Sequence, residues 1–273
     1  MYRFEAFERG LAQRVAAWPR RKQTAEVRPV RTASPESLSG LPPLGLAPAS
    51  VPDRKPRPRH ISELKSIHGG EDIWVLGAGP SIDYVEPAFF ANKVTIGVNE
   101  IYQHVPVTYL VRKELANSEA ALASGIPVIV SEYDCGKLHR ARNQLPGEYF
   151  YFPHATNRVD RPIDLDVIGT DRIVVSWSTL TSALHIAAYM GAANIMVCGH
   201  DCGVIDGRAN ISGYHATGAV EVPFDDAGYR AWLAGIEHQT IAVRERLAAV
   251  YGVRIHSLNP FINLHCEGHQ VSR

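Results

Sequence analysis

Short apolar runs that alternate with helix-length segments limit the folds open to this chain more than any other feature. From about residue 60, runs of four or five mostly apolar residues are each followed by a turn and then, in most cases, by a helical pattern. Such short runs are typical of a parallel sheet buried on both faces. We predict strands at 73–76, 94–98, 107–111, 127–130, 149–152, 194–198 and 253–257, and helices at 81–90, 114–123, 178–190 and 226–251. The fold class is therefore α/β, with a Rossmann-like, mostly parallel sheet and helices on both faces.

The segment before residue 60 differs in pattern from this body. Five apolar residues at helical spacing stand near its start: Phe4, Phe7, Leu11, Val15 and Trp18. They predict an amphipathic amino-terminal helix in an arm that spans 1–27. Residues 28–59 hold eight prolines and no apolar period, which predicts a disordered linker. The domain itself is expected over 60–273.

Charge is unevenly distributed between these parts. Residues 1–60 carry 12 Lys or Arg against 5 Asp or Glu, whereas 61–273 carry 16 against 23. A basic arm on an acidic body is expected to bind an anionic surface or a protein partner. Packing of the arm on its own body or on a sister subunit is the alternative.

The sequence shows no apolar run of transmembrane length and no pattern of a secretory signal. Its four cysteines do not have the spacing of a disulfide framework or of paired zinc ligands, so we expect no structural zinc. These features favour a cytoplasmic protein, which could lie peripherally at the inner membrane surface.

A glycine turn follows the first strand of the body, and an amide and a carboxylate follow the second. The turn contains Gly77, Gly79, Pro80 and Ser81. It lacks the third glycine of a dinucleotide fingerprint, and the chain has no P-loop, so neither NAD nor a P-loop nucleotide is expected. The turn suits one phosphate or a ribose, or it is a tight turn without a ligand. Asn99 and Glu100 stand where such sheets contact a ribose.

Two later segments carry further polar side chains. Five hydroxyl residues gather at the start of the helix predicted at 178–190, more than capping requires, which predicts an anion site: Ser176, Ser178, Thr179, Thr181 and Ser182. Residues 197–218 run from a strand end through a glycine-rich loop that contains His200, Asp201 and His215. Asp and His in such a loop are candidates for acid–base chemistry or metal binding.

Taken together, the stretches VLGAGPSID, IGVNEIY, STLTSALHIAAYMGAANIMVCGHD and GYHATG resemble the 6-hydroxymethylpterin diphosphokinase-like family. That family is related to motility accessory factors and to bacterial sialyltransferases that use CMP-sugars. The resemblance covers residues 70–260 and implies a nucleotide-binding transferase domain. It implies that the glycine turn and Asn99 hold the nucleotide, with Ser178 and Thr179 near its phosphates. Asp201 matches the family's strand-end aspartate, and His215 matches a loop histidine that acts as general base in sialyltransferase-like members.

Three functions follow. The favoured one is glycosyl transfer from a CMP-activated acidic sugar to a glycan or small hydroxyl acceptor, with His215 and Asp201 as catalytic residues. The second is ATP- and Mg²⁺-dependent diphosphoryl transfer to 6-hydroxymethylpterin or a similar alcohol, with Asp201 on the metal and Glu100 as the candidate second carboxylate. The third is a non-catalytic nucleotide-binding assembly protein.

Overall fold

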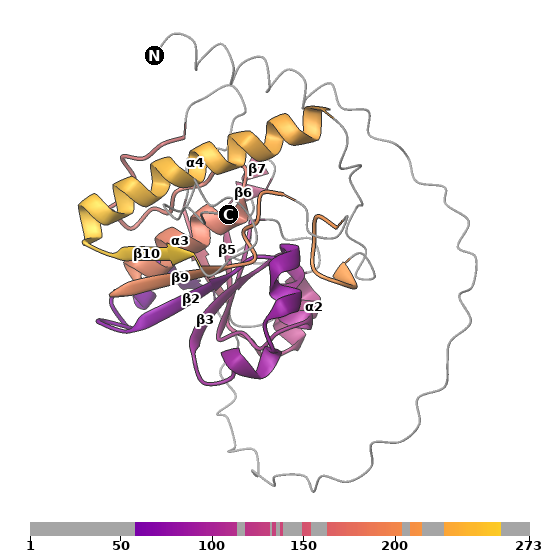
Figure 1. Ribbon diagram of the computed structural model, residues 1–273. Helices are drawn as coiled ribbons and strands as arrows, with labels where there is room; N and C mark the ends of the chain where they lie inside the picture. The colour runs from indigo at the N-terminus through magenta and orange to yellow at the C-terminus, as the bar shows by residue number, and fades with distance from the viewer. Residues whose placement is uncertain are drawn as a thin grey trace, which may run out of the picture.

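The fold is built on one eight-stranded parallel sheet, seen edge-on in the computed structural model of Figure 1. The structure describes residues 58–113, 118–131, 133–134, 137–138, 149–153, 163–203, 208–214 and 227–257. The strands are β1 (Arg59–His60), β2 (Asp72–Leu76), β3 (Val94–Val98), β4 (Tyr109–Arg112), β5 (Val128–Ser131), β8 (Tyr149–Phe152), β9 (Asn194–Cys198) and β10 (Arg254–Ser257). Their order is β1-β8-β5-β4-β3-β2-β9-β10, and every neighbouring pair is parallel. A separate antiparallel pair joins β6 (Tyr133–Asp134) to β7 (Lys137–Leu138). The predicted α/β class is confirmed.

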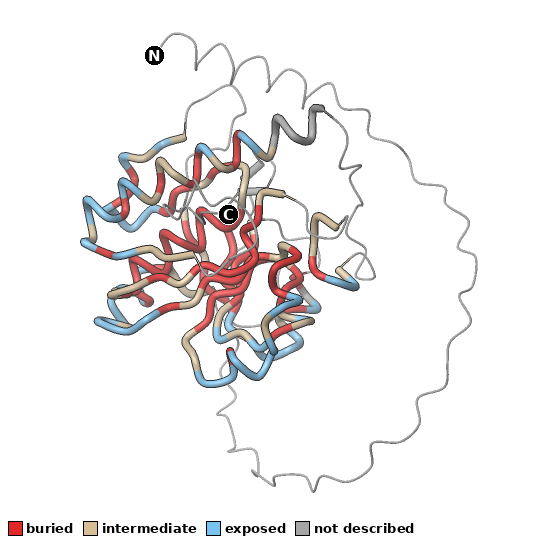
Figure 2. The backbone as a smooth tube through the Cα atoms, viewed as in Figure 1, coloured by how far each residue is buried: buried red, intermediate tan, exposed pale blue. Residues whose placement is uncertain are grey.

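Helices cover both faces of the sheet, with α3 and α4 on one side and α2 on the other (Figure 1). Helix α3 (Thr179–Tyr189) packs on the central strands, and α4 (Ala227–Tyr251) packs on α3 and β10. Helix α2 (Ser118–Ala123) packs near β5. The sheet and α3 form the buried centre of the molecule (Figure 2).

Alternation along the strands explains why both faces are apolar. In β2, Ile73 and Val75 join the core beneath α3, whereas Leu76 and the partly buried Trp74 belong to the cluster on the opposite face. Successive side chains of a strand point to opposite faces, so a strand buried on both sides is apolar at nearly every position. The runs used to predict the strands are continuous and do not alternate for that reason.

The segment predicted as one helix at 81–90 is the clearest difference from the sequence prediction. It forms two 3-10 helices instead, η2 (Pro80–Tyr84) and η3 (Pro87–Phe90). Each begins at a proline, and the residue before each proline has an extended ψ, 156° at Gly79 and 128° at Glu86. Proline disfavours the α conformation in the residue that precedes it, so a continuous α-helix across Pro87 is blocked.

Five further short elements were not predicted: β1, β6, β7, η1 (Ile61–Leu64) and η4 (Asn99–Gln103). Strand β1 adds an edge to the sheet and begins one residue before the predicted domain boundary. The predicted arm and nearly all of the predicted linker, residues 1–57, lie outside the described residues. No helix in the described part of the chain is long and apolar enough to cross a membrane.

Candidate functional site

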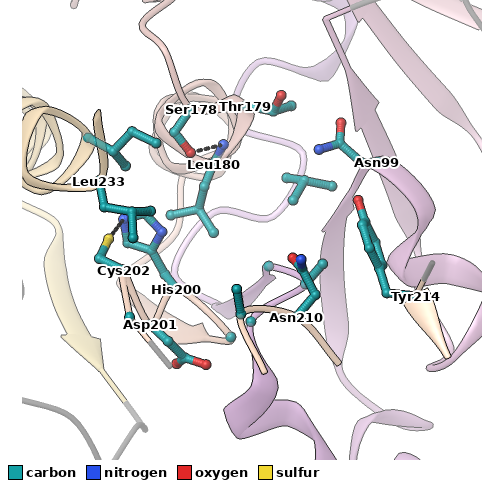
Figure 3. A pocket seen from close by; sticks show the side chains of 18 residues that line it. Asn99, Ser178, Thr179, Leu180, His200, Asp201, Cys202, Asn210, Tyr214 and Leu233 are labelled. Atoms are coloured by element: carbon teal, nitrogen blue, oxygen red, sulfur yellow. Dashed lines mark hydrogen bonds between the residues drawn. The ribbon is translucent and has the colours of Figure 1, made fainter. Parts of the chain in front are cut away.

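The strand order reverses between β2 and β9, which are neighbours although more than a hundred residues separate them in sequence. From β2 the chain adds strands in one direction as far as β5 and then β8, and later returns to place β9 on the other side of β2. A crevice at the carboxyl ends of the strands is expected at such a point. A pocket of about 250 Å³ lies there (Figure 3). Its walls come from the turns after β2, β3 and β9, from the start of α3, from residues 209–214 and from α4.

The glycine turn after β2 packs against the glycine turn after β9. The backbone N–H groups of Gly77 and Gly79 donate to the carbonyl oxygens of Cys198 and Gly199, each at 2.8 Å. A Cβ atom at Gly79 would lie 2.6 Å from the Gly199 oxygen and 2.5 Å from a carboxylate oxygen of Asp201. Gly79 has an ordinary φ of −69°, so glycine is required there by space and not by backbone conformation. Gly77 and Gly79 also line the pocket, so they let the two turns meet at its floor.

Asp201 holds this arrangement from the β9 side. One of its carboxylate oxygens accepts the backbone N–H of Ser81 at 2.7 Å, and the other accepts the Ser81 hydroxyl at 2.6 Å. Both residues are buried. Asp201 lines the pocket, whereas Pro80 and Ser81 do not. Because its hydroxyl donates to Asp201, Ser81 holds the glycine turn in place at the floor of the pocket.

Asn99 and Glu100 lie next to each other at the end of β3, but their surroundings differ. Asn99 lines the pocket and adopts a left-handed backbone conformation, with φ of 55°. Glu100 is buried in a bidentate ion pair with Arg112, at 2.7 and 3.0 Å. It does not line the pocket. The carboxylate that was predicted to meet a ribose therefore neutralises an arginine behind the wall.

Tyr214 completes that side of the pocket and was missed as a site residue. Burial, together with the negative charge of Glu100, raises the pKa of its phenol, and a hydrogen bond with Asn99 acts in the opposite direction. The phenol is therefore protonated near neutral pH and can donate a hydrogen bond. Its place in the glycine-rich segment 197–218 was the available signal, since that segment had been singled out for His215.

The start of α3 opens into the same pocket, with Ser178 and Thr179 in its wall (Figure 3). The Ser178 side chain caps the helix by accepting the backbone N–H of Leu180 at 3.2 Å. Behind it, Lys113 donates to the carbonyl oxygens of Ser176 and Trp177, at 2.8 and 3.0 Å. A helix amino terminus carries partial positive charge and N–H groups without intrahelical partners. This end of the pocket can therefore bind an anion such as a phosphate.

His200 also lines the pocket and is almost fully buried. Its Nε2 lies 3.0 Å from the hydroxyl of Thr240, which itself donates to the Ile236 carbonyl at 2.8 Å. Nε2 is therefore the donor, and Nδ1 carries no proton. Burial lowers the pKa of His200 to about 4, so the ring is neutral at pH 7. Cys202 lies 3.7 Å from Nε2, but a neutral imidazole does not supply the positive charge that activates a cysteine.

A polar cluster fixes residues 208–214 against the glycine turn. The Asp83 carboxylate accepts hydrogen bonds from the Arg208 guanidinium and from the backbone and hydroxyl of Ser212. Burial alone would raise the pKa of Asp83, but these hydrogen bonds and the charge of Arg208 outweigh it and lower the pKa. The backbone N–H of Ile211 also donates to the Ala78 carbonyl at 2.9 Å. The loop that carries Asn210 and Tyr214 is thus built into the site.

The remaining site predictions concern His215 and a metal. His215 lies outside the described residues, so its predicted role as general base stays a prediction. No group of three or more His, Cys, Asp or Glu side chains within the described ranges is arranged to hold a metal ion. Mg²⁺ prefers carboxylate oxygens, yet those of Asp201 are bonded to Ser81 and those of Glu100 to Arg112. Of these two residues only Asp201 lines the pocket, and its predicted role as a metal ligand stays a prediction.

The fold and the pocket define a class: an α/β protein with a doubly covered parallel sheet and a polar pocket at its topological switch point. No protein-family model matches the chain, and no curated protein sequence matches it. The resemblance to the diphosphokinase-like family therefore stays a prediction.

Among solved structures, the chain is similar to the monofunctional α-2,3-sialyltransferase Cst-I from Campylobacter jejuni. The identity is 13%, 74% of this chain and 81% of that one are covered, and the TM-score is 0.45. It is similar also to the sialyltransferase CST-II in complex with a trisaccharide acceptor and CMP, at 10% identity and a TM-score of 0.44, and to CstII from Campylobacter jejuni in complex with CMP-3FNeuAc, at 12% and 0.44. Both of these comparisons cover 74% of this chain and 86% of the other.

Proposed function

We propose that this protein is a nucleotide-dependent transferase that moves a glycosyl group from a CMP-activated acidic sugar to a hydroxyl acceptor. The observation that carries the proposal is the combination of groups around one pocket. The amino terminus of α3, with Ser178 and Thr179, faces a space that Asn99 and Tyr214 also line. A helix amino terminus suits a phosphate, and amide and phenol groups suit the hydroxyls and base edge of a nucleoside. The choice of CMP follows the motif resemblance.

In the proposed reaction, the bond between the anomeric carbon of the sugar and a phosphate oxygen of CMP breaks, and its electron pair leaves with CMP. The acceptor oxygen forms the new bond to the anomeric carbon, and its proton passes to the imidazole of His215. The start of α3 stabilises the departing phosphate, whose charge increases as the bond breaks. Asp201 acts through Ser81 by fixing the floor of the pocket, so we assign it a positioning role.

Nucleotide binding is tested with CMP, CDP, UDP and ATP, each with and without Mg²⁺, by calorimetry and thermal shift. CMP should bind most tightly and independently of Mg²⁺. At 100 times the dissociation constant, a ligand adds about 2.7 kcal/mol of apparent stability. Binding of ATP only with Mg²⁺ would favour the diphosphokinase instead.

A pair of variants at Ser178 tests the anion site. Ser178→Ala removes the helix cap and should cost about 1 kcal/mol of stability. Ser178→Asp keeps a capping oxygen and the stability, but its negative charge would face the bound phosphate. Affinity for CMP should therefore fall roughly tenfold or more in Ser178→Asp, with cytidine affinity unchanged. Equal losses for CMP and cytidine would place the phosphate elsewhere.

The role of His215 is tested by transfer kinetics. His215→Ala should lower kcat about 10²- to 10⁴-fold with little change in CMP affinity, because a general base acts mainly in the transition state. A loss of CMP affinity in proportion to activity would make His215 a nucleotide ligand, and wild-type activity in the variant would remove it from the mechanism.

A further inference from the structure

A second, larger cavity lies at the amino ends of the strands, whereas the candidate site lies at their carboxyl ends. It has a volume of about 530 Å³ and lies where β4, β5 and β8 begin. Six of its lining residues are apolar: Leu64, Ile67, Leu122, Ile126, Pro127 and Phe150. Ile67 is 43% exposed and is one of the few large apolar side chains that are exposed in the described part of the chain. We call this cavity the amino-edge groove.

The chain enters the described fold at the rim of this groove. Arg59 is the first residue of β1 and lines the groove. Its guanidinium lies 4.6 Å above the Phe150 ring, and its Nε donates to Glu63 at 2.9 Å. Residues 1–57 are therefore tethered directly beside the cavity. A tether converts binding into an intramolecular event and favours even a weak contact.

The tethered segment contains a sequence that matches the groove. Phe4, Phe7, Leu11, Val15 and Trp18 repeat at helical spacing, and amphipathic helices of this kind bind apolar grooves. The 39 residues from 19 to 57 can span at most roughly 130 Å, so reach is not limiting.

We propose that the apolar side of residues 4–18 binds in the amino-edge groove of its own chain. The groove lies at the amino ends of the strands and the candidate pocket at their carboxyl ends, so this contact leaves the pocket open. The proposal does not depend on the proposed function.

Hydrogen exchange on the full chain tests the contact. Amides of residues 4–18 should exchange about tenfold or more slowly than in the groove variant Ile67→Glu. Because 43% of Ile67 is exposed and the residue is not part of the buried core, this variant should keep the fold. Phe89→Glu, at a residue of similar exposure (45%) that does not line the groove, is the matched control and should keep the protection. The arm variant Leu11→Glu should in turn speed exchange at residues 64–67 and 122–127.

Three outcomes would overturn the proposal. Exchange of residues 4–18 could be equally fast in the wild type and in Ile67→Glu. Protection could rise with protein concentration together with a dimer detected by light scattering, which would make a second copy the occupant. Protection could also appear only with vesicles containing phosphatidylserine, which would make the arm a membrane-binding element.

Discussion

Two hydrogen bonds from Ser81 to Asp201 join the strand ends that face each other at the switch point. They connect residues 120 positions apart in sequence, and both groups are buried. A carboxylate that accepts a backbone N–H and a hydroxyl forms short, charge-assisted bonds. The glycine turns are thus locked together at the floor of the pocket.

Ser81→Ala should lower the free energy of unfolding by about 1.5–3 kcal/mol, because it deletes a hydrogen bond to a charged group. Ser124→Ala is the control, since its hydroxyl donates to the uncharged carbonyl of Ala121 at an exposed position. It should cost only about 0.5–1.5 kcal/mol. Urea unfolding of both variants measures the difference. Equal losses of stability would mean that the bond to Asp201 stabilises the fold no more than a bond to an uncharged carbonyl.

At the scale of elements, α3 is fixed by a buried histidine as well as by its apolar side chains. His185 accepts the backbone N–H of Val174 at its Nδ1, 3.0 Å away, and its Nε2 lies 3.2 Å from the hydroxyl of Tyr251 at the end of α4. Nε2 therefore carries the proton of a neutral ring. Burial lowers the pKa of His185 to about 3. This histidine is a core residue with both ring nitrogens hydrogen-bonded.

The buried histidines predict a loss of stability in acid. His185 and His200 are neutral in the folded protein, with pKa values of about 3 and 4, whereas in the unfolded chain each binds a proton below about pH 6.5. The unfolded state then holds more protons, so the free energy of unfolding falls as the pH decreases. Each histidine should contribute about 1.4 kcal/mol per pH unit between pH 6 and pH 4.5.

Urea unfolding across that range measures how steeply the free energy of unfolding changes with pH. His185→Gln should remove about half of the pH dependence that these two histidines cause. If the variant and the wild type kept the same slope, His185 would not be the group that titrates.

At the scale of the whole molecule, the sheet begins at β1 and depends on the short segment after it. Arg59 and His60 pair with β8, and Ile61 and Leu64 of η1 are buried in the core beneath α3. The described fold therefore starts at the very end of the proline-rich stretch 28–59.

Truncation should define this boundary sharply. A chain that begins at Pro58 should unfold cooperatively, because it keeps β1 and η1. A chain that begins at Lys65 loses two buried aliphatic side chains, each worth about 1.5–3 kcal/mol, and leaves the β8 edge uncovered. Circular dichroism and urea unfolding compare the two. A shorter chain as stable as the longer one would show that β1 and η1 are dispensable.

The sequence alone determined the parts of this protein that depend on local pattern. Apolar runs located seven strands and the two long helices within about two residues, because a strand buried on both faces leaves a continuous apolar signal. The same pattern marked the strand ends at Gly77, Asn99 and Gly199, which line one pocket. Pro87 is the local signal against one continuous helix at 81–90, because a proline disfavours the α conformation in the residue before it.

Only the tertiary structure decided which polar groups meet. Ser81 faces Asp201, Glu100 faces Arg112, and Asp83 faces Arg208 and Ser212. The first and third pairings join positions 120 or more residues apart and follow from the placement of β9 beside β2. Strand order is set by how the whole chain packs its two apolar faces, and no local pattern of residues records it. Sequence therefore marked the polar residues at the strand ends, and the order of the sheet determined which of them line the pocket and which are paired behind it.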